Sequence, residues 1–443
     1  MKHRRLQLLF ASYVIPTVGA MLISGAYQLI DGFFIGNFIG AAGLAGANIG
    51  WSYITLLLGF GLLVGVGTGS LYSIAKGAEE HERALRILGQ TLVLIVIPGI
   101  LLGLFLYQSA PFLVSILGDP SHAASAEFLE ASRLAIDFVR VFAVSAPFVI
   151  GSLALPFLVR NVGSPYRATL YMAIGVSLNI ISSYLLIVVL EWSVFGAALA
   201  SVIGETCAML LGFRFVFFKS GEPIQWRHVK PDLKLIGEIL LNGGSAFFMY
   251  IYVGFIMALH HKMLVKYGGT LAVSAYTITG YIITVYYFGI EGVANGIQPV
   301  ISKLYGGEKH RSARAIIRMM VFVGMLYGIT LTLVLQLFPG FFTLWFTSDP
   351  ALTEVAVHAI RFNLFVLFLE GVFVLVTVFF QAIGEGAKAL VISIGNLFIQ
   401  VPFLFILPRF LDLDGVWLTM PIASIVLAIP VTYWAWRRYQ KIG

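Results

Sequence analysis

The sequence predicts an all-α membrane protein with twelve transmembrane helices, arranged as two six-helix bundles. Three observations support this fold class. The 443-residue chain is 59% hydrophobic and only 11% charged, which leaves too few polar residues to cover a water-soluble domain. Apolar runs of about 20 residues recur along the chain, each long enough to cross a hydrocarbon core of ~30 Å as a helix. Two parts of the sequence also repeat one another.

Twelve apolar runs are the candidate transmembrane helices. They lie near residues 8–36, 42–74, 86–107, 134–158, 168–190, 194–218, 236–261, 270–302, 315–338, 356–381, 388–408 and 414–436. Transmembrane β-strands would appear as shorter segments of alternating hydrophobicity, so helices are the better interpretation. The first run is too long for a secretory signal and is followed by many others, so we expect it to be an uncleaved first span.

An internal repeat indicates how the helices are grouped. The segment SLYSIAKGAEEHERA (70–84) aligns with PVISKLYGGEKHRSA (299–313), with five identities at an offset of 229 residues. The repeat predicts an amino-terminal six-helix lobe (1–217), a cytoplasmic linker (218–234) and a carboxy-terminal six-helix lobe (235–443). Because each lobe has an even number of spans, both lobes have the same orientation, and an internal pseudo-two-fold axis along the membrane normal relates them.

Basic residues predict the orientation in the membrane. With both termini in the cytoplasm, 22 of the 28 Lys and Arg residues lie at the termini or in the even-numbered loops, and such an excess is typical of cytoplasmic loops. Arg160 is one of these residues and is assigned to a loop. The net charge of +7 therefore reflects membrane topology, and no nucleic-acid partner is expected. We expect a multi-pass protein of the inner (cytoplasmic) membrane, in contact with membrane lipid.

A polar stripe crosses the end of the first span. Ser24, Gln28 and Asp31 follow one another at four and three residues, so they lie on one helix face. Ionisable residues within spans are rare and usually functional, which favours a functional role for Asp31. The alternative is a carboxylate that reaches water at the outer end of the span and caps a loop. Pairs of polar residues four apart recur on two later spans of this lobe: Asn179 with Ser183, and Ser201 with Glu205.

The carboxy-terminal lobe carries two further stripes. On the eighth span, five polar residues at intervals of four, four, three and four lie on one face: Tyr287, Glu291, Asn295, Gln298 and Ser302. On the tenth span, Glu370 shares a face with Asn363, Thr377 and Gln381. Such regularity favours a water-lined surface. The residues expected to line a substrate cavity are Gln28, Tyr287, Glu291, Asn295, Gln298, Glu370 and Thr377. A structural ion pair with Lys262, Lys266 or Arg361 is the alternative role for the two acids.

Several stretches of the sequence resemble a known family. In chain order they are LIDGFFIGNFIGAAGLAGANI, SIAKGAEEHERA, NVGSPYRATLYMAIGVSLNIISSYLLI, GAALASVIGE, NGIQPVISKLYGGEKHRSA and GVWLTMPIAS. Together they resemble the multidrug and toxic compound extrusion (MATE) family of cation-coupled exporters, across essentially the whole chain. The resemblance matches Asp31 with the first-helix aspartate of the family. It matches Glu370 with a position where some members carry a conformationally important carboxylate.

The resemblance implies a V-shaped pair of six-helix bundles and a secondary active antiporter. Such a protein exports organic cations or amphiphilic drugs in exchange for protons or sodium ions, by rocking-type alternating access. Cavity acids and aromatic rings suit lipophilic cations, which they attract through charge and cation–π contacts. The chain has no Walker A motif, so ATP is not expected to drive transport. We expect no cofactor, no resident metal and a monomer.

Two other functions compete with drug export. A flippase for a lipid-linked precursor shares the broader superfamily fold, but it would favour several cavity arginines that face a diphosphate. A membrane enzyme such as a polyprenyl transferase would need paired aspartate clusters for a metal diphosphate. The close pair in this sequence, Asp412 and Asp414, falls on an outer loop. We therefore expect a transporter that is not an enzyme, with the flippase as the alternative.

The expected coupling ion follows from the residues around Asp31. An ionised carboxylate within a span carries a dehydration penalty of at least ~2.5 kcal/mol, which a proton or a sodium ion removes. A sodium site needs several oxygen ligands around a persistent charge, and Ser183 stands where many members of the resembled family have a second aspartate. A proton needs only one carboxylate. We expect a proton, with sodium near Asp31 as the alternative. The residues expected at the coupling site are Asp31, Asn179, Ser201 and Glu205.

Overall fold

Helices form nearly the whole structure, a computed structural model that describes residues 3–117 and 126–442. For residues 3, 26–29, 41, 113–117 and 126–128 the backbone alone is described. Every regular element in the described residues is helical, and η1 and η2 are short π-helical turns. In chain order they are α1 (His3–Phe38), α2 (Ala41–Gly77), α3 (His81–Leu117), α4 (Ala126–Val144), α5 (Ala146–Asn161), α6 (Pro165–Ser183), η1 (Tyr184–Val189), α7 (Ser193–Arg214), η2 (Phe215–Lys219), α8 (Trp226–Val229), α9 (Leu233–Gly306), α10 (His310–Leu337), α11 (Pro339–Thr343), α12 (Pro350–Asn363), α13 (Leu367–Ala382), α14 (Gly386–Ile406) and α15 (Pro408–Gln440).

The helices agree with the twelve spans expected from the sequence. In the described residues, nine helices are long and apolar enough to cross a membrane, and two bent pairs, α4 with α5 and α12 with α13, raise the number to eleven. The 74-residue α9 is itself two helices that meet at Gly269, where φ is 65°. Counting its halves separately gives twelve spans. The predicted all-α membrane fold is therefore confirmed.

The two bent pairs occupy corresponding places in the two halves. α4 and α5 meet at Ser145 with a bend of 64°, and α12 and α13 meet with a bend of 49°. Pro147 at the start of α5 has no backbone N–H, so the hydrogen-bond ladder of α4 cannot continue through it. Left-handed backbone also recurs at the repeat offset, at Glu79 (φ 62°) and Glu308 (φ 54°). The repeated sequence thus produces repeated backbone geometry.

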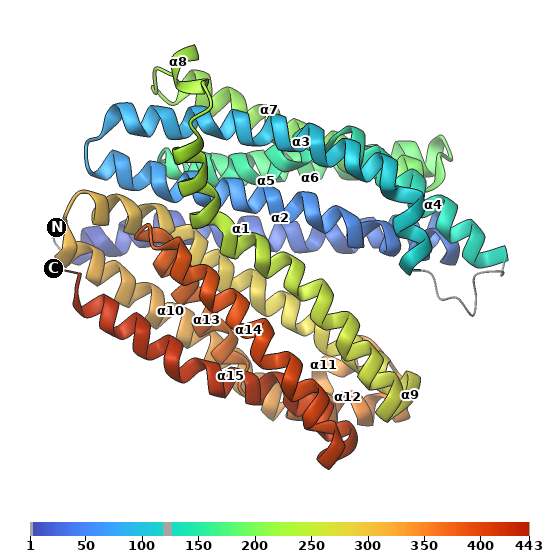
Figure 1. Ribbon diagram of the computed structural model, residues 1–443. Helices are drawn as coiled ribbons and strands as arrows, with labels where there is room; N and C mark the ends of the chain where they lie inside the picture. The colour runs from blue at the N-terminus through green and yellow to red at the C-terminus, as the bar shows by residue number, and fades with distance from the viewer. Residues whose placement is uncertain (1–2, 118–125, 443) are drawn as a thin grey trace.

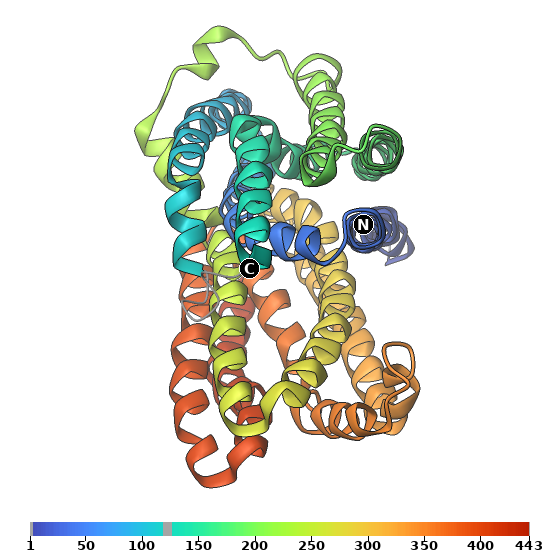
Figure 2. The same cartoon turned by 90° about the vertical axis from the view of Figure 1, so that its right-hand side faces the viewer.

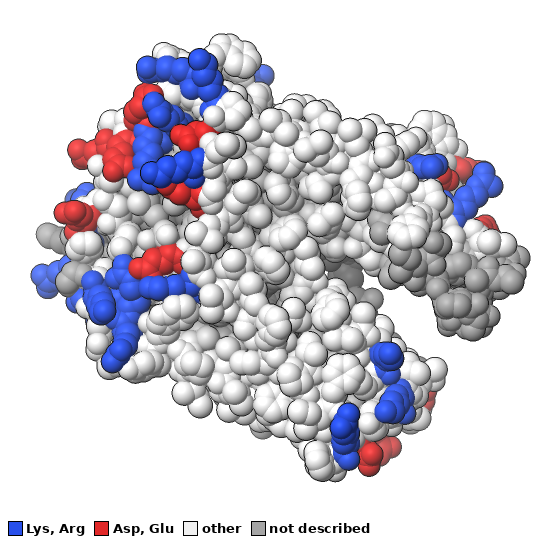
Figure 3. Space-filling model, viewed as in Figure 1, with Lys and Arg blue, Asp and Glu red and all other residues white. Residues whose placement is uncertain are grey.

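The helices form two arms that meet at one end and diverge toward the other (Figure 1). α1 to α7 build one arm and α9 to α15 build the other, and both termini lie at the end where the arms meet. Figure 2 views the molecule from the diverging end and shows the two groups of helices separately. In Figure 3, charged side chains gather at both ends of the molecule and leave an uncharged band between them, as expected for a surface in lipid.

Each arm has its own hydrophobic core, and two helices begin in the core of the opposite arm. Leu6 and Phe10 of α1 pack in the core built mainly by residues after 263. Leu235 and Ile239 of α9 pack in the core built mainly by residues before 217. The first turns of α1 and α9 are therefore exchanged between the arms. Any opening of the end that holds the termini must slide or bend these two helices.

The arms meet at a close crossing of α2 and α9, which we call the inner closure and define by Ser73, Gly77, Asn161, Gln298 and Gly306. Ser73 donates to Oδ1 of Asn161 at 2.6 Å, and the Asn161 amide donates across to Gln298 of the other arm at 3.5 Å. Gln298 in turn donates to Ser302 at 2.8 Å. Gly77 and Gly306 let the two backbones touch. This crossing separates the space between the arms from the end that holds the termini.

The linker between the arms is fixed to the amino-terminal arm. Gln90 of α3 donates to the carbonyl oxygens of His228 (3.1 Å) and Lys230 (2.8 Å), and its own side-chain oxygen accepts from the Asp232 amide (3.1 Å). Glu222 accepts from the Tyr72 hydroxyl at 2.8 Å. Because these bonds begin on α2 and α3, and because Leu235 and Ile239 just after the linker pack in the core of the first arm, the linker is held against that arm.

Candidate substrate cavity and coupling site

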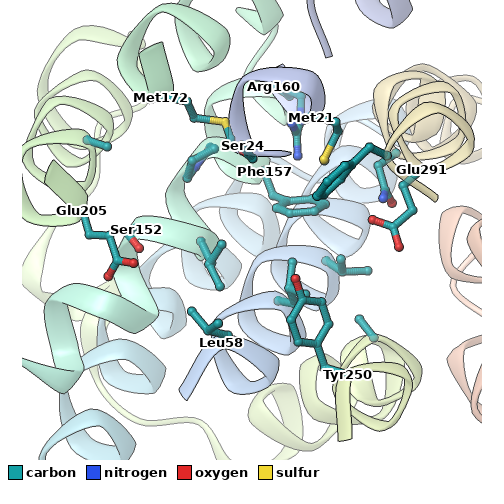
Figure 4. A pocket seen from close by; sticks show the side chains of 18 of the residues that line it. Met21, Ser24, Leu58, Ser152, Phe157, Arg160, Met172, Glu205, Tyr250 and Glu291 are labelled. Carbon is teal, nitrogen blue, oxygen red and sulfur yellow. The ribbon is translucent and has the colours of Figure 1, made fainter. Parts of the chain in front are cut away.

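A cavity of about 230 Å³ lies between the two arms. Helices of both arms line it, and Figure 4 shows Met21, Phe157 and Met172 from the first arm with Tyr250 and Glu291 from the second. Figure 3 shows the hollow between the arms open at the end away from the termini. Thioether and aromatic groups adapt to apolar ligands of different shapes. The cavity therefore suits a largely apolar molecule.

Among the described lining residues of this cavity, three are charged: Glu205, Glu291 and Arg160. Glu205 comes from α7, Arg160 from α5 and Glu291 from α9, so the two carboxylates belong to different arms. Figure 4 shows the two carboxylates well apart from each other. Each arm therefore offers a carboxylate that attracts a cationic ligand, and the amino-terminal arm also offers one guanidinium.

Asn295 and Thr377 also line the cavity wall, next to Glu291 of the same predicted set. Gln298 lies at the inner closure, where its side chain is 2% exposed. Tyr287 and Glu370 are absent from the described lining residues and contact each other behind the wall. The side chain of Gln28 lies outside the described residues. The structure thus separates the predicted cavity set into wall, closure and a cluster within the carboxy-terminal arm.

The predicted coupling residues of the amino-terminal arm form one buried cluster. Ser201 donates to Oδ2 of Asp31 at 3.0 Å, and the Asn179 amide lies 3.4 Å from Oδ1 of Asp31 and 3.4 Å from the Ser201 hydroxyl. Asp31 is 7% exposed, and Asn179 and Ser201 are each 1% exposed. A carboxylate this deep in the bundle changes the local charge balance whenever it gains or loses a proton or cation.

Two glycines bring the helices of this cluster together. A Cβ atom on Gly204 would lie 2.5 Å from the Gly175 carbonyl oxygen, and one on Gly175 would lie 2.7 Å from the Gly204 carbonyl oxygen. α6 and α7 therefore pack backbone to backbone. Asn179 lies four residues after Gly175 and Ser201 three residues before Gly204, so the contact places both side chains in front of Asp31.

Oxygen atoms around this cluster have no hydrogen-bond partner. They are Oδ1 of Asn179, the hydroxyl of Ser183 and Oε2 of Glu205, all buried. Glu205 lies near enough to Asp31 for the two charges to interact. Buried acceptors without donors are costly, and a cation or a carboxyl proton would satisfy them. The donor set fits a hard cation, because it consists of carboxylate, amide and hydroxyl oxygens. Within the described residues, no group of three His, Cys, Asp or Glu side chains forms a metal site.

Glu370 anchors a second buried cluster, in the carboxy-terminal arm. The Tyr287 hydroxyl donates to its Oε2 at 2.9 Å, and the Ser424 hydroxyl donates to its Oε1 at 2.5 Å. Asn396 also contacts this carboxylate. Glu370 is 3% exposed. Its satisfied hydrogen bonds distinguish it from Glu205, and they join α9, α13, α14 and α15 at one point.

Sequence reasoning missed two parts of these sites. Arg160 was assigned to a cytoplasmic loop, and this assignment is wrong, because its side chain is 1% exposed and lines the cavity. The signal was present, since Arg160 follows the apolar stretch PFLV directly. Ser424 and Asn396 were also missed. Their partnership with Glu370 depends on how four helices pack, which no local spacing reveals.

Two helical arms around a largely apolar cavity with charged side chains on its wall define a membrane transporter of the two-lobe class. The sequence matches the MatE family over residues 16–185 and 245–406. It is 28% identical to the multidrug export protein MepA of Staphylococcus aureus, over 94% of this chain and 90% of that protein. A solved outward-facing multidrug resistance MATE family transporter has a TM-score of 0.87 at 23% identity, covering 98% of this chain and 96% of that one. A MATE structure in the bent conformation has a TM-score of 0.85 at 25% identity, covering 99% and 98%.

The chain therefore belongs to the MatE family. The resemblance found in its sequence motifs is confirmed, and membership of a transporter family shows that the protein is a transporter and not an enzyme.

Proposed function

We propose that this protein is a secondary active antiporter that exports organic cations and amphiphilic drugs. One observation carries the proposal. A largely apolar cavity between two arms holds a carboxylate from each arm, Glu205 and Glu291, and the hollow between the arms is open at the end away from the termini. The relatives named as multidrug export proteins support the same substrate class. Rocking of the arms about the inner closure would expose the cavity to each side of the membrane in turn.

The proposed coupling site is the cluster of Asp31, Asn179, Ser201 and Glu205. We propose a proton as the coupling ion, because loading one carboxylate with a proton is enough to change the charge of this cluster. Sodium is the second candidate, and the unpartnered oxygens of Asn179 and Ser183 favour it. Loading the site neutralises a carboxylate within the bundle. The loaded and unloaded states then favour different packings of α1, which spans both arms.

The orientation and assembly are part of this proposal. Both termini are placed in the cytoplasm of a cell with an inner membrane, and the protein acts as a monomer. The cavity of this structure then faces outward, because it opens at the end away from the termini. The lobes are taken as residues 1–217 and 235–443, joined by the linker 218–234, which the hydrogen bonds from Gln90 attach to the first lobe.

A flippase for a lipid-linked precursor is the second candidate function. The observation that favours it is the cavity guanidinium of Arg160, which suits a diphosphate. Among the described lining residues this is one arginine against two carboxylates, so the balance of charge favours export of molecules that carry a cation.

Transport by purified protein in liposomes tests the proposal. Liposomes receive an organic dye cation with either a proton gradient or a sodium gradient imposed alone. We expect uphill dye movement with the proton gradient at constant sodium concentration. Uphill movement with the sodium gradient alone would replace the proton by sodium. The absence of transport across a chemically broad panel of cations and amphiphiles, together with movement of a labelled lipid diphosphate, would favour the flippase.

A further inference from the structure

Arg160 is a buried cation that the structure leaves without a counter-charge. It is the only lysine or arginine in the buried class among the residues whose exposure is described. Its Nε and Nη2 atoms have no hydrogen-bond partner. None of the ion pairs between described residues includes it. Among the described side chains, its one aromatic or ionic contact is the Phe157 ring, whose centroid lies 4.3 Å from the guanidinium carbon.

The fold does not require a cation at this position. Gly163 and Gly384 both have positive φ, 96° and 76°, and follow corresponding helices of the two arms. Arg160 and Gln381 each precede their glycine by three residues, so they are equivalent in the repeat. Gln381 is uncharged, and its amide donates to Ser245 at 2.7 Å. The amino-terminal arm has a guanidinium where the other arm uses a neutral side chain.

An unpaired guanidinium in this place has a large energetic cost. Removing a charge from water carries a large free-energy penalty unless the charge is paired. A cation–π contact with Phe157 offsets only part of that penalty, even when it is desolvated. Arg160 also lies on the wall of the cavity, and Figure 4 shows its guanidinium between Met21 and Phe157. A ligand anion in the cavity would supply the missing partner.

We propose that Arg160 forms an anion subsite at the end of the cavity nearest the inner closure, and that preferred substrates carry a carboxylate or phosphate as well as a cation. This inference rests on the proposed export function and names its substrate class. The planar guanidinium binds such anions with two parallel hydrogen bonds. Glu291 and Glu205 lie elsewhere on the same wall and take the cationic part. A zwitterionic amphiphile thus meets a partner at each end.

The matched dyes rhodamine B and rhodamine B ethyl ester test the subsite. They share one cationic ring system, and only the first has a free carboxylate. Binding is measured by fluorescence anisotropy on the purified full-length protein in an uncharged sugar detergent. We expect the wild-type protein to bind rhodamine B at least about tenfold more tightly than the ester. Two acids in the cavity would otherwise favour the ester, so an equal or reversed preference overturns the proposal without any variant.

Variants at Arg160 then test whether this residue causes the preference for rhodamine B over its ester. Arg160→Gln should lower the ratio of the two dye affinities at least about tenfold. Arg160→Lys should retain part of the preference for rhodamine B, because a lysine keeps the charge but cannot donate two parallel hydrogen bonds from a planar group. Arg167→Gln, an exposed arginine in the same arm, is the control and should keep the wild-type ratio. An unchanged ratio in Arg160→Gln would overturn the assignment.

Three further outcomes separate the sources of the anion and the two proposals. If added phosphatidylglycerol abolishes the preference for rhodamine B while ester binding persists, a lipid phosphate occupies Arg160 and the substrate proposal is overturned. If wild-type protein binds and exports the ester but not rhodamine B, the anion subsite fails while drug export stands. If it binds and exports neither dye nor other amphiphiles, the export function itself fails.

Discussion

Gly77 of α2 packs directly on the backbone of Lys303 in α9, where a Cβ atom on Gly77 would lie 2.1 Å from the Lys303 carbonyl oxygen. The contact is reciprocal, because a Cβ atom on Gly306 would lie 2.0 Å from the Ile74 carbonyl oxygen. Both pairs are related by the 229-residue repeat offset. The inner closure is therefore a backbone contact between equivalent residues of the two arms.

Gly77→Ala should weaken this closure. The added methyl group must separate α2 from α9, and overpacking of this kind typically costs about 1–3 kcal/mol. We expect a larger distance between the arms at the terminal end and slower export. The measurement is the distance between spin labels at Glu80 and Lys309, in a Cys207→Ser background.

Gly237→Ala is the control for this change, since a Cβ atom on Gly237 has no neighbour within 4 Å. It should leave both distance and export unchanged. A Gly77→Ala protein with the wild-type distance distribution and wild-type export would show that the crossing has room for a side chain.

Asp31→Asn should leave the protein folded and able to bind substrate, while active export falls to background. The amide imitates a permanently neutralised carboxylate, so the cluster with Asn179 and Ser201 no longer changes charge. Export by the wild-type protein should respond to the proton gradient, and the variant should not respond at any external pH. The measurement is gradient-driven dye uptake in liposomes, together with dye binding.

Glu354→Gln, which alters an exposed carboxylate on α12, serves as the control and should keep wild-type uptake. Uphill uptake by Asp31→Asn protein at the native rate would remove Asp31 from the coupling site.

Glu291→Gln should weaken binding of cationic substrates more than binding of neutral ones. The amide keeps the shape of the side chain but removes the charge from the cavity wall. A partly screened charge contact of about 1 kcal/mol predicts a loss of roughly fivefold for a monovalent cation. Dye binding by the purified protein, with a cationic dye and a neutral analogue, measures the difference. Glu291→Asp should retain most of the cation affinity, and equal losses for both dyes would indicate a packing role instead.

Glu370→Ala should destabilise the carboxy-terminal arm. It removes the acceptor of the half-buried Tyr287 hydroxyl, at about 1–3 kcal/mol for an unsatisfied group. The buried Ser424 hydroxyl also loses its bond to Glu370 but still donates to the Met420 carbonyl at 2.7 Å. We expect a lower thermal unfolding temperature in detergent. In a double-mutant cycle, Glu370→Ala should add little once Tyr287→Phe and Ser424→Ala are present. Additive losses would show that the three side chains do not act as one network.

The fold could be predicted from the sequence because a chain that crosses a lipid bilayer can adopt only a few backbone architectures. Span length, the repeat around Gly77 and Gly306, and the distribution of basic residues are all local or periodic signals. Asn179 and Ser201 could be selected for the same reason, since the spacing along each helix selects a face. Their contact with Asp31 in three dimensions follows from the backbone packing at Gly175 and Gly204.

Side-chain positions that depend on packing between helices far apart in the sequence were harder to predict. The sequence around Arg160 gives two opposite signals, since the apolar stretch PFLV before it indicates a span and Asn161 and Gly163 after it indicate a loop. Its burial depends on where α5 ends relative to the inner closure, a relation between helices of both arms. Glu370 was selected as a cavity residue from its helical face. Its contacts with Tyr287 and Ser424 instead lie behind the cavity wall. Helical spacing shows which residues share a face, but it does not show which neighbouring helix packs against that face.

Arg160 and Glu291 present opposite charges to one cavity, and this arrangement would determine how the electrical potential of the cell acts on export. A monovalent cation that leaves in exchange for one proton moves no net charge. A zwitterion that leaves in the same exchange is neutral, so each cycle brings one positive charge inward. A potential of 100 mV then adds about 2.3 kcal/mol per cycle, equivalent to a concentration ratio of about fiftyfold. An energised cell would therefore expel zwitterions against much steeper gradients than monovalent cations.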